Sequence, residues 1–305
     1  MAVVTTGFFD GVHLGHRHVI ETLVSSARER GEEAVVVTFW PHPRTVLQQD
    51  ARDFRILNTL DEKKALLLGL GVDRVEVLPF TRSFAALTAA EYLDLLRERF
   101  DATLIVMGYD NRIGRDRKKA IELDGVTGLS SFVVPRSSFS GSTSSFSGFT
   151  SSFSGLSRES HPISSTRIRE ALKDGDVSTA NTMLGYQYTL TGAVVAGNRL
   201  GRTIGFPTAN MQLYEPLKLV PGNGVYAVDV EVLGNSYKGM CNIGMRPTVG
   251  GVGRTIETHI LDFDQDIYGL PLTLRFRRRI RSEQKFASLD AHRSQLVLDS
   301  LSARE

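Results

Sequence analysis

Residues 2–16 decide the fold of the first half of the chain, and they read Ala-Val-Val-Thr-Thr-Gly-Phe-Phe-Asp-Gly-Val-His-Leu-Gly-His. The first five are a short run rich in β-branched residues that ends at a glycine, which is typical of a buried strand. From His16 to Arg30 the apolar residues recur with helical spacing. A strand that passes through a short loop into a helix is the repeating unit of a parallel sheet.

The same alternation continues to about residue 107. β-rich runs at residues 2–6, 34–39, 74–78 and 103–107 alternate with helical patterns at residues 16–30, 61–70 and 89–100. Capping-box spacing, Thr59 with Glu62 and Thr88 with Glu91, marks two helix starts. We therefore predict an α/β, Rossmann-like domain whose parallel sheet is covered on both faces. Ligands of such sheets bind beyond the carboxyl ends of the strands, where the loop of residues 7–16 falls.

The pattern changes near Tyr188 to strands separated by glycine turns. The β-rich runs are residues 188–196, 224–233, 237–243, 256–261 and 272–280. They predict a small antiparallel barrel, closed by a terminal helix at about residues 288–301. A short helix that begins around Val177 precedes the change, so we place the boundary near residues 184–187. The expected domains are residues 1–185 and residues 186–305.

The stretch Gly201-Arg-Thr-Ile-Gly-Phe-Pro-Thr-Ala-Asn210 has the residues needed to hold a nucleotide and its magnesium. Gly201 and Gly205 permit backbone conformations that other residues avoid and a close approach to phosphate. Pro207 stiffens the exit, and Thr208 and Asn210 offer oxygens to a hard cation. The stretch is no Walker A loop, because the glycine spacing is one residue short and an Arg replaces the Lys. A glycine-rich hairpin between strands is the alternative.

Composition limits the classes of partner. The 36 Lys and Arg nearly balance the 34 Asp and Glu, which gives no electrostatic argument for nucleic acid or membrane as a partner. No apolar stretch approaches the ~20 residues of a membrane span, and no signal peptide is evident. Cys241 is the single cysteine, so there is no internal disulfide, and we expect a cytoplasmic protein. The apolar residues around Cys241 in the sequence favour a role as a small buried side chain over a role as a nucleophile.

Residues 137–157 repeat with a period of seven, as Ser-Ser-Phe-Ser-Gly followed by two variable residues. Serine and glycine are weak helix formers, and each repeat has too few apolar positions for a coiled-coil seam. We therefore predict a flexible low-complexity loop.

Distinctive motifs follow one another along both halves of the chain. The N-terminal half carries Gly7-Phe-Phe-Asp-Gly-Val-His-Leu-Gly-His16, Pro41-His-Pro43 and Ser164-Ser-Thr-Arg-Ile-Arg169. The C-terminal half carries Gly201 to Asn210, Gly224-Val-Tyr, Asn242-Ile-Gly-Met-Arg-Pro-Thr248, Glu257-Thr-His-Ile-Leu-Asp262, Asp266-Ile-Tyr-Gly269 and Arg281-Ser-Glu-Gln-Lys-Phe286. In this order they resemble the bacterial bifunctional riboflavin kinase/FAD synthetase (FMN adenylyltransferase) family, and the resemblance covers nearly the whole chain. It implies ATP-dependent phosphorylation of riboflavin to FMN, then adenylylation of FMN to FAD with release of pyrophosphate.

For the first domain the resemblance implies a nucleotidylyltransferase site. His13 and His16 would contact the ATP phosphates as fixed donors to the charge that develops at the α-phosphate. Further ATP contacts are implied for Gly7, Phe9, Asp10, Gly15, Ser164, Ser165, Thr166, Arg167 and Arg169. Ser164 to Thr166 are also an ordinary helix cap. A zinc site at the two histidines is the alternative, but it lacks further ligands nearby.

For the barrel the resemblance implies a riboflavin and MgATP site. Glu257 would be the general base, Thr208 and Asn210 would contribute to the magnesium site, and Arg281, Glu283 and Phe286 would lie on the flavin side. The alternative for Glu257 is an ordinary strand carboxylate. Asp110 and Arg112 are implied flavin contacts of the first domain, but Asn111 and Ile113 depart from the family, which has rings there.

These departures leave a second possibility open, a riboflavin kinase with an impaired adenylyltransferase domain. A third, from another class, is a flavin-binding protein without catalysis. Such a binder would not need Glu257, Thr208 and the histidine pair together. The sequence predicts small-molecule substrates, neither nucleic acid nor membrane as partner, and no particular oligomeric state.

Overall fold

The computed structural model describes residues 1–47, 53–119, 122–123, 128–134, 163–197, 200–248 and 251–305. The predicted loop at residues 137–157 lies outside them. The chain forms two compact units, of residues 1–52 with 60–164 and of residues 53–59 with 165–305. No helix of the described part is both long and apolar enough to cross a membrane.

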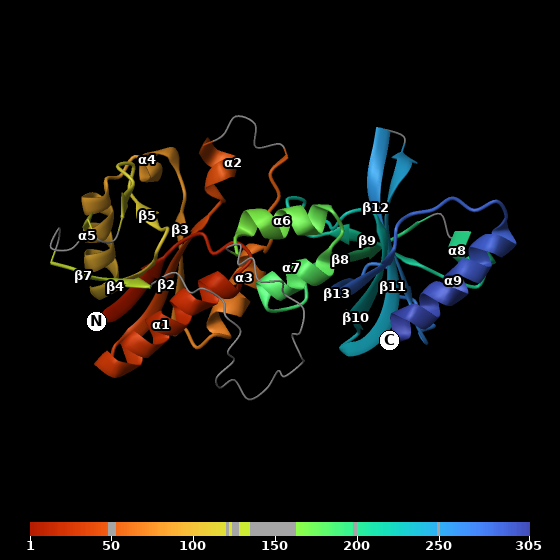
Figure 1. The fold of residues 1–305 in the computed structure, drawn as a ribbon, viewed down its shortest axis with the longest axis horizontal. Helices are drawn as coiled ribbons and strands as arrows, with labels where there is room; N and C mark the ends of the chain where they lie inside the picture. The colour runs from red at the N-terminus through yellow and green to blue at the C-terminus, as the bar shows by residue number, and fades with distance from the viewer. Residues whose placement is uncertain (48–52, 120–121, 124–127, 135–162, 198–199, 249–250) are drawn as a thin grey trace, which may run out of the picture. The chain divides into compact units, whose positions relative to one another are not determined.

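The first unit is built on a five-stranded parallel sheet, in the order β3-β2-β1-β4-β7 (Figure 1). Its strands are β1 (Ala2–Thr6), β2 (Glu33–Trp40), β3 (Arg74–Pro79), β4 (Ala102–Gly108) and β7 (Ser130–Val134). Its helices are α1 (Leu14–Arg30), α2 (Pro43–Leu47), α3 (Leu60–Leu68), α4 (Arg82–Ala85) and α5 (Ala89–Phe100). A two-stranded ribbon pairs β5 (Arg112–Ile113) with β6 (Lys118–Lys119). The predicted α/β fold is confirmed.

Successive residues of the central strand β1 enter different cores, because side chains alternate across a sheet. Val4 packs with Leu93 and Leu96 of α5. Val3 packs on the other face with residues of α1 that include Leu23. Helices therefore cover both faces of the sheet, as predicted. The expected capping box at α5 forms, with Thr88 N–H donating to Glu91 Oε2 at 2.7 Å and Glu91 N–H donating to Thr88 Oγ1 at 3.3 Å.

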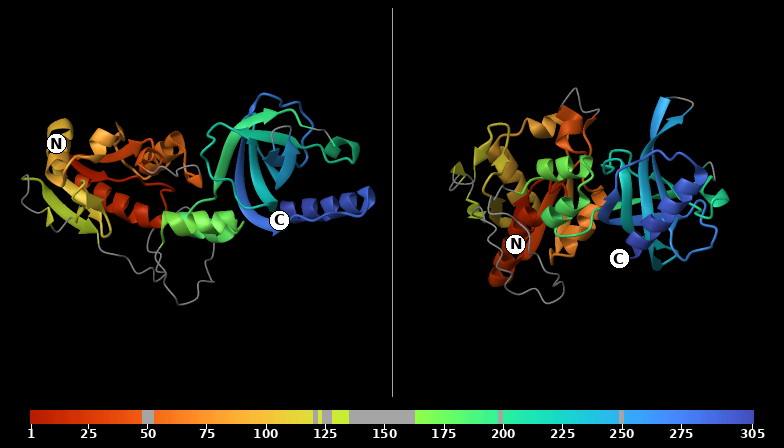
Figure 2. Two further views of the ribbon diagram at one scale, coloured as in Figure 1. Left: turned by 90° about the horizontal axis from the view of Figure 1, so that it is seen from above. Right: turned by 45° about the vertical axis from the view of Figure 1, so that its right-hand side comes forward.

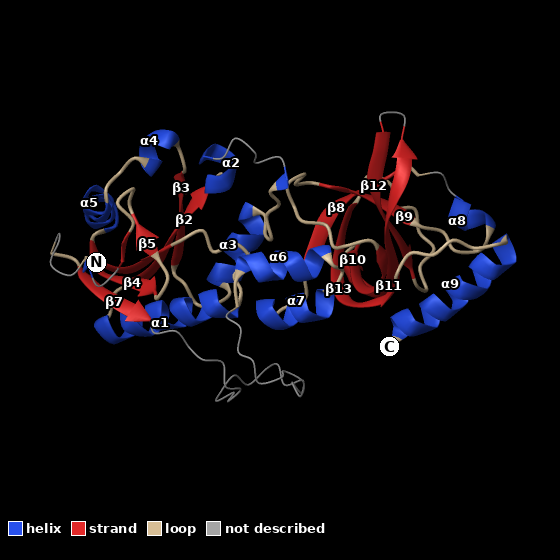
Figure 3. Ribbon diagram, turned by 45° about the horizontal axis from the view of Figure 1, so that its top comes forward, coloured by secondary structure: helices blue, strands red, loops and turns tan. Residues whose placement is uncertain are grey.

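The second unit contains a closed antiparallel barrel with the strand order β10-β11-β12-β9-β8-β13, whose strands are labelled in Figure 3. The strands are β8 (Thr189–Val195), β9 (Ala209–Leu213), β10 (Gly224–Val232), β11 (Asn235–Thr248), β12 (Gly251–Ile260) and β13 (Pro271–Arg281). The unit's helices are α6 (Ser165–Lys173), α7 (Val177–Leu184), α8 (Leu200–Thr203) and α9 (Leu289–Arg304). The barrel and terminal helix are confirmed, whereas β9 was not among the predicted strands.

The contacts divide the chain after Ser164, instead of at the expected boundary between residues 185 and 186. Helices α6 and α7 pack with the barrel: Asn181 Nδ2 donates to Phe276 O at 2.8 Å, and Gly222 N–H donates to Leu172 O at 2.7 Å. Residues 53–59 join them, because Ile56 forms a bridge with Lys218. The division into two functional domains at residue 185 stays a prediction.

Helix α9 lies along the outside of the barrel (Figure 2) and is fastened by a buried ion pair. Arg281 donates from Nε and Nη2 to Asp299, at 3.0 and 2.7 Å. Asp299 is only 1 % exposed, and Gln295 Nε2 donates to its Oδ1 at 2.9 Å. Removing one partner of such a pair leaves the other charge buried without compensation.

Asp299→Ala should therefore destabilise the second unit by about 3 kcal/mol, since Arg281 would lose its counter-charge. The measurement is the urea unfolding midpoint of the full chain, followed by circular dichroism. Asp262→Ala is the matched control, because Asp262 forms an exposed ion pair with Arg304 of the same helix. Equal midpoints for the two variants would contradict the assigned role of Asp299.

Candidate active sites

The loop after β1 holds two non-glycine residues at positive φ. Phe9 has φ 46° and Val12 has φ 35°, on either side of Gly11 at 91°. Phe9 and Val12 are both buried, and Val12 N–H donates to Phe9 O at 3.0 Å. Such conformations persist only where packing imposes them, and they cluster at functional sites. The loop is therefore a candidate site on backbone geometry alone.

The two predicted histidines meet at the start of α1. His13 is the N-cap, and its Nδ1 accepts from His16 N–H at 3.3 Å. The rings stack with centroids 3.6 Å apart and an angle of 16° between their planes. A Cβ on Gly15 would lie 3.2 Å from His13 Cε1, so a side chain there would press on the ring. The glycine between the histidines permits the stacking.

His16 is held uncharged. Burial lowers its pKa well below the ordinary value, and the positive charges of His13 and Lys63 lower it further. Its Nδ1 is buried and has no hydrogen-bond partner among the described residues. Buried polar atoms are ordinarily paired, so this nitrogen is available to a ligand. The amino end of α1 adds free N–H groups and a positive dipole end, which favour an anion.

Two buried charged residues lie close to this pair. Asp10 is 5 % exposed and Lys63, on α3, is 3 % exposed. Burial lowers the pKa of Lys63 to about 8, an effect that the negative charge of Asp10 opposes. Asp10 was among the predicted ATP contacts, but Lys63 was missed. The sequence spacing could have indicated that Lys63 is buried, because Leu60, Lys63 and Leu67 fall on one face of α3.

The two departures from the family pattern have structural roles here. Asn111 Nδ2 donates to Thr6 O at 3.2 Å, at the end of β1. Ile113 is 4 % exposed and belongs to the core beneath α5. The predicted flavin contacts Asp110 and Arg112 are exposed on either side of Asn111. The side chain of Ile113 therefore contributes to the core of the unit.

The predicted phosphate contacts at residues 164–169 begin α6, as expected. Arg169 is engaged within its own unit: its Nε donates to Arg55 O at 2.9 Å, and its guanidinium lies 4.9 Å from the centre of the Phe54 ring. It therefore holds residues 53–59 against α6. Phosphate binding by Arg169, and by Ser164, Ser165, Thr166 and Arg167, stays a prediction.

In the barrel, strand register brings two predicted residues together. Glu257 of β12 pairs with Asn210 of β9 on one side and with Asn242 of β11 on the other. Residues directly opposite in antiparallel strands share a face, with Cβ atoms about 5 Å apart. Asn210, Glu257 and Asn242 therefore form one polar row across three strands. The sequence analysis named Asn242 only as part of a motif and assigned it no role, because its position beside Glu257 depends on this strand register.

The loop before Asn210 is fixed at both ends. Phe206 N–H donates to Gly201 O at 2.8 Å, and a Cβ on Gly201 would collide with Phe206 O. Gly205 has φ 85°, which explains the second glycine. His259 Nδ1 donates to Pro207 O at 2.7 Å. Burial lowers the pKa of His259, so a neutral ring with the proton on Nδ1 fits this contact.

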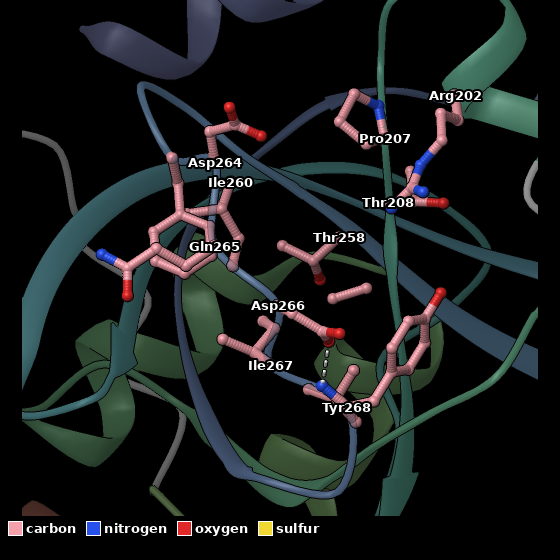
Figure 4. A pocket seen from close by; sticks show the side chains of 13 residues that line it. Arg202, Pro207, Thr208, Thr258, Ile260, Asp264, Gln265, Asp266, Ile267 and Tyr268 are labelled. Carbon is pink, nitrogen blue, oxygen red and sulfur yellow. Dashed lines mark hydrogen bonds between the residues drawn. The ribbon is translucent and has the colours of Figure 1, made fainter.

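A pocket opens beside this loop (Figure 4). Arg202, Pro207 and Thr208 lie on one side, Asp264 and Gln265 on the other, and Thr258 and Asp266 between them. Tyr268 N–H donates to Asp266 Oδ1 at 3.1 Å, and both residues line the pocket. Thr208 was predicted, whereas the acidic side at residues 264–266 was not assigned a role. The sequence feature that could have indicated this acidic side is the run Asp-Phe-Asp-Gln-Asp at residues 262–266.

The residues predicted on the flavin side lie at the end of β13, which is Arg281, and in the segment after it. Arg281 is held by Asp299, and its guanidinium is 5.7 Å from the centre of the Phe286 ring. Phe286 stacks on His292 of α9 at 4.6 Å. Glu283 is exposed and accepts from Asn223 Nδ2 at 2.9 Å. A Cβ on Gly244 would collide with Glu283, so this bare backbone in β11 makes room for the carboxylate.

Comparison with known proteins gives the same two activities. A riboflavin kinase family model matches residues 184–305, and an FAD synthetase family model matches residues 1–131. A bifunctional riboflavin kinase/FMN adenylyltransferase of Escherichia coli K12 is 40 % identical over 306 positions, covering 99 % of this chain and 92 % of the relative. Its counterpart in Bacillus subtilis 168 is 35 % identical over 310 positions, covering 99 % and 91 %.

A solved structure with a different description has the same fold. The crystal structure of a macrolide-efflux protein from Streptococcus pneumoniae superposes with a TM-score of 0.88 at 34 % identity. The match covers 100 % of this chain and 94 % of that one.

Proposed function

Because the chain belongs to the family of bifunctional riboflavin kinases/FMN adenylyltransferases, we propose that each of its two reactions uses a separate set of side chains. The chain phosphorylates riboflavin to FMN with ATP, and transfers an adenylyl group from ATP to FMN to give FAD and pyrophosphate. The barrel row around Glu257 serves the first reaction. The loop of residues 7–16 and the start of α1 serve the second.

In the kinase reaction Glu257 accepts the proton of the ribityl 5′-hydroxyl as that oxygen attacks the γ-phosphate. The observation that carries this proposal is the register that sets Glu257 opposite Asn210, at the exit of the glycine loop. A carboxylate beside a phosphate-binding loop can take a proton from the attacking hydroxyl. Asn242, on the other side of Glu257, offers an amide that can orient the carboxylate.

Thr208 and Asn210 would hold Mg²⁺, with Gly201, Gly205 and Pro207 shaping the loop. The side-chain oxygens of Thr208 and Asn210 suit this ion, since Mg²⁺ prefers oxygen ligands and is commonly bound by one or two side chains together with substrate phosphates. When bound, the ion would neutralise charge on the transferred phosphoryl group. A Cβ on Gly197 would collide with the Asn210 amide, so the bare backbone there leaves that side chain its position.

In the adenylyl transfer His13 and His16 donate hydrogen bonds to the α-phosphate as its charge grows. A neutral imidazole carries one N–H donor, so the low pKa of His16 is compatible with this role. Gly7, Phe9, Asp10 and Gly15 fix the loop around the phosphates. Ser164, Ser165, Thr166, Arg167 and Arg169 would hold the departing pyrophosphate, and Asp110 and Arg112 the flavin. In the barrel Arg281, Glu283 and Phe286 would border riboflavin.

The kinase-only alternative has no support in the comparisons, because family models of both activities match the chain. Ile113 belongs to the core, and Asn111 Nδ2 donates to Thr6 O at the end of β1. A cytoplasmic location remains a prediction from composition, as does the expectation of neither nucleic acid nor membrane as partner.

Glu257→Gln should lower the riboflavin phosphorylation rate ~100- to 10,000-fold, because the amide keeps the shape but cannot take the proton. Adenylylation of supplied FMN should stay near normal. Both rates are measured by separating the flavin products. Glu231→Gln is the matched control, since Glu231 is an exposed barrel carboxylate paired only with Arg275 in the contacts described. Kinase turnover equal to the control would remove Glu257 from the role.

His16→Ala should lower FAD formation from FMN and ATP ~100- to 1,000-fold, the usual loss for one donor at a preorganised site. Riboflavin phosphorylation should be unaffected. His18→Ala, on the same helix, serves as control and should leave both rates unchanged. An active parent with an equally active His16→Ala would contradict the assignment, and an inactive parent would contradict the second reaction itself.

Gly197→Ala should weaken kinase activity by displacing the Asn210 amide, and should raise the Mg²⁺ concentration needed for half-maximal rate. If the two changes act through one group, the double variant with Asn210→Ala should be no worse than Asn210→Ala alone. Additive losses in this cycle would show that Gly197 acts elsewhere.

A further inference from the structure

Lys63 is an anomaly in the core of the first unit. It is 3 % exposed, and Leu67, four residues later on α3, is fully buried. Burying an ammonium costs free energy that an apolar side chain of similar length would not. Its Nζ donates to Thr38 Oγ1 at 3.3 Å. A lysine at such a position calls for an explanation beyond packing.

The contacts of Lys63 lead to the loop after β1 by two routes. Thr38 Oγ1, which accepts from Lys63, donates in turn to Phe8 O at 3.4 Å. The negative charge of Asp10, two residues further along the loop, acts on the ammonium directly. The lysine therefore connects α3 and β2 to the same strained loop that positions the histidines.

We propose that Lys63 is a positioning residue for adenylyl transfer, which anchors the loop of residues 8–10 through Thr38 and Asp10. The proposal rests on the proposed role of the histidine pair. Lys63 itself need not touch the substrate. Its positive charge opposes protonation of the imidazole, so the ring presents a stable donor pattern to the incoming phosphates.

A dependence on pH follows from the charges around Lys63. The groups that act on it or share its field are Asp10 on the loop and His13 and His16 at the start of α1. With a pKa of about 8, the ammonium loses its proton as pH rises through 8, and Asp10 then loses its counter-charge. The anchor is present below that pH and absent above it. For adenylylation, kcat/KM should therefore fall above pH 8, since this ratio reports groups of the free enzyme.

The test compares the full-length parent with Lys63→Met, which keeps the length and removes the charge. Lys64→Met is the matched control, a neighbouring lysine on the same helix that is only partly buried. For Lys63→Met we expect a loss of about 10- to 100-fold in kcat/KM for FMN adenylylation, the scale of a small misplacement at a reacting centre. We also expect its fall above pH 8 to disappear. Parent and control should keep that fall, and riboflavin phosphorylation should be normal in all three.

A second readout is independent of turnover. The ring resonances of His16, identified by their loss in His16→Ala, should titrate at a higher pH in Lys63→Met than in the parent, because one positive charge is gone. If the parent makes no FAD, the proposed function fails, yet this titration still tests the proposal. An unshifted His16 titration, or a parent-like pH profile in Lys63→Met, would overturn it.

Lys63→Met could unfold the first unit, which circular dichroism would reveal. Thr38→Val then provides the decisive variant, because it keeps both charges and the shape but breaks the hydroxyl link to Phe8 O. A reduced adenylylation rate with normal phosphorylation supports the anchoring role. An unchanged rate in Thr38→Val, together with a parent profile that is flat from pH 7 to 9.5, would contradict it.

Discussion

The first unit depends on a backbone that is forced to turn where its central strand ends. β1 is paired on both sides, and its side chains enter two different cores, so its end cannot shift. Phe9 and Val12 take positive φ directly after it and are themselves buried. The packing of these two side chains imposes the strain, and the strained loop sets His13 at the start of α1. A helix start capped by His13 and two stacked imidazoles follow from one fixed strand.

The barrel positions its residues by a different constraint, the register of antiparallel strands. Because directly opposite residues share a face, one pairing fixes Asn210, Glu257 and Asn242 in a row. A slip of one residue in β12 would turn Glu257 to the other face and bring Thr258 into the row. The contact between His259 and Pro207 fastens the glycine loop to the same strand. The glycine loop and the carboxylate of Glu257 are therefore held at fixed positions relative to each other.

Sequence patterns predicted the features that depend on local spacing. The parallel sheet, the barrel, the capping box at Thr88 and a helix that starts near the histidine pair were all predicted from residues close together in the chain. The helix begins at Leu14, two residues before the predicted start at His16. Strand β9 was missed because Pro207 and two glycines precede it within ten residues, which is a turn signal. The partners of Arg281 and Arg169 were also missed. Both arginines make tertiary contacts that no local pattern encodes, with Asp299 and Arg55.

The different charges of the two residue sets follow from the charges of their substrates. Riboflavin is uncharged, so a carboxylate such as Glu257 can stand beside the attacking hydroxyl without repelling the acceptor. In the second reaction both FMN and ATP carry phosphates, and their approach must overcome mutual repulsion. In the proposed mechanism, neutral donors such as His16 would stabilise the developing charge without needing a counter-ion. One buried cation, Lys63, contributes positive charge from behind the loop while Asp10 limits its cost. Asp10 is itself buried, at 5 % exposure, so its carboxylate and the ammonium of Lys63 compensate each other's charge inside the protein.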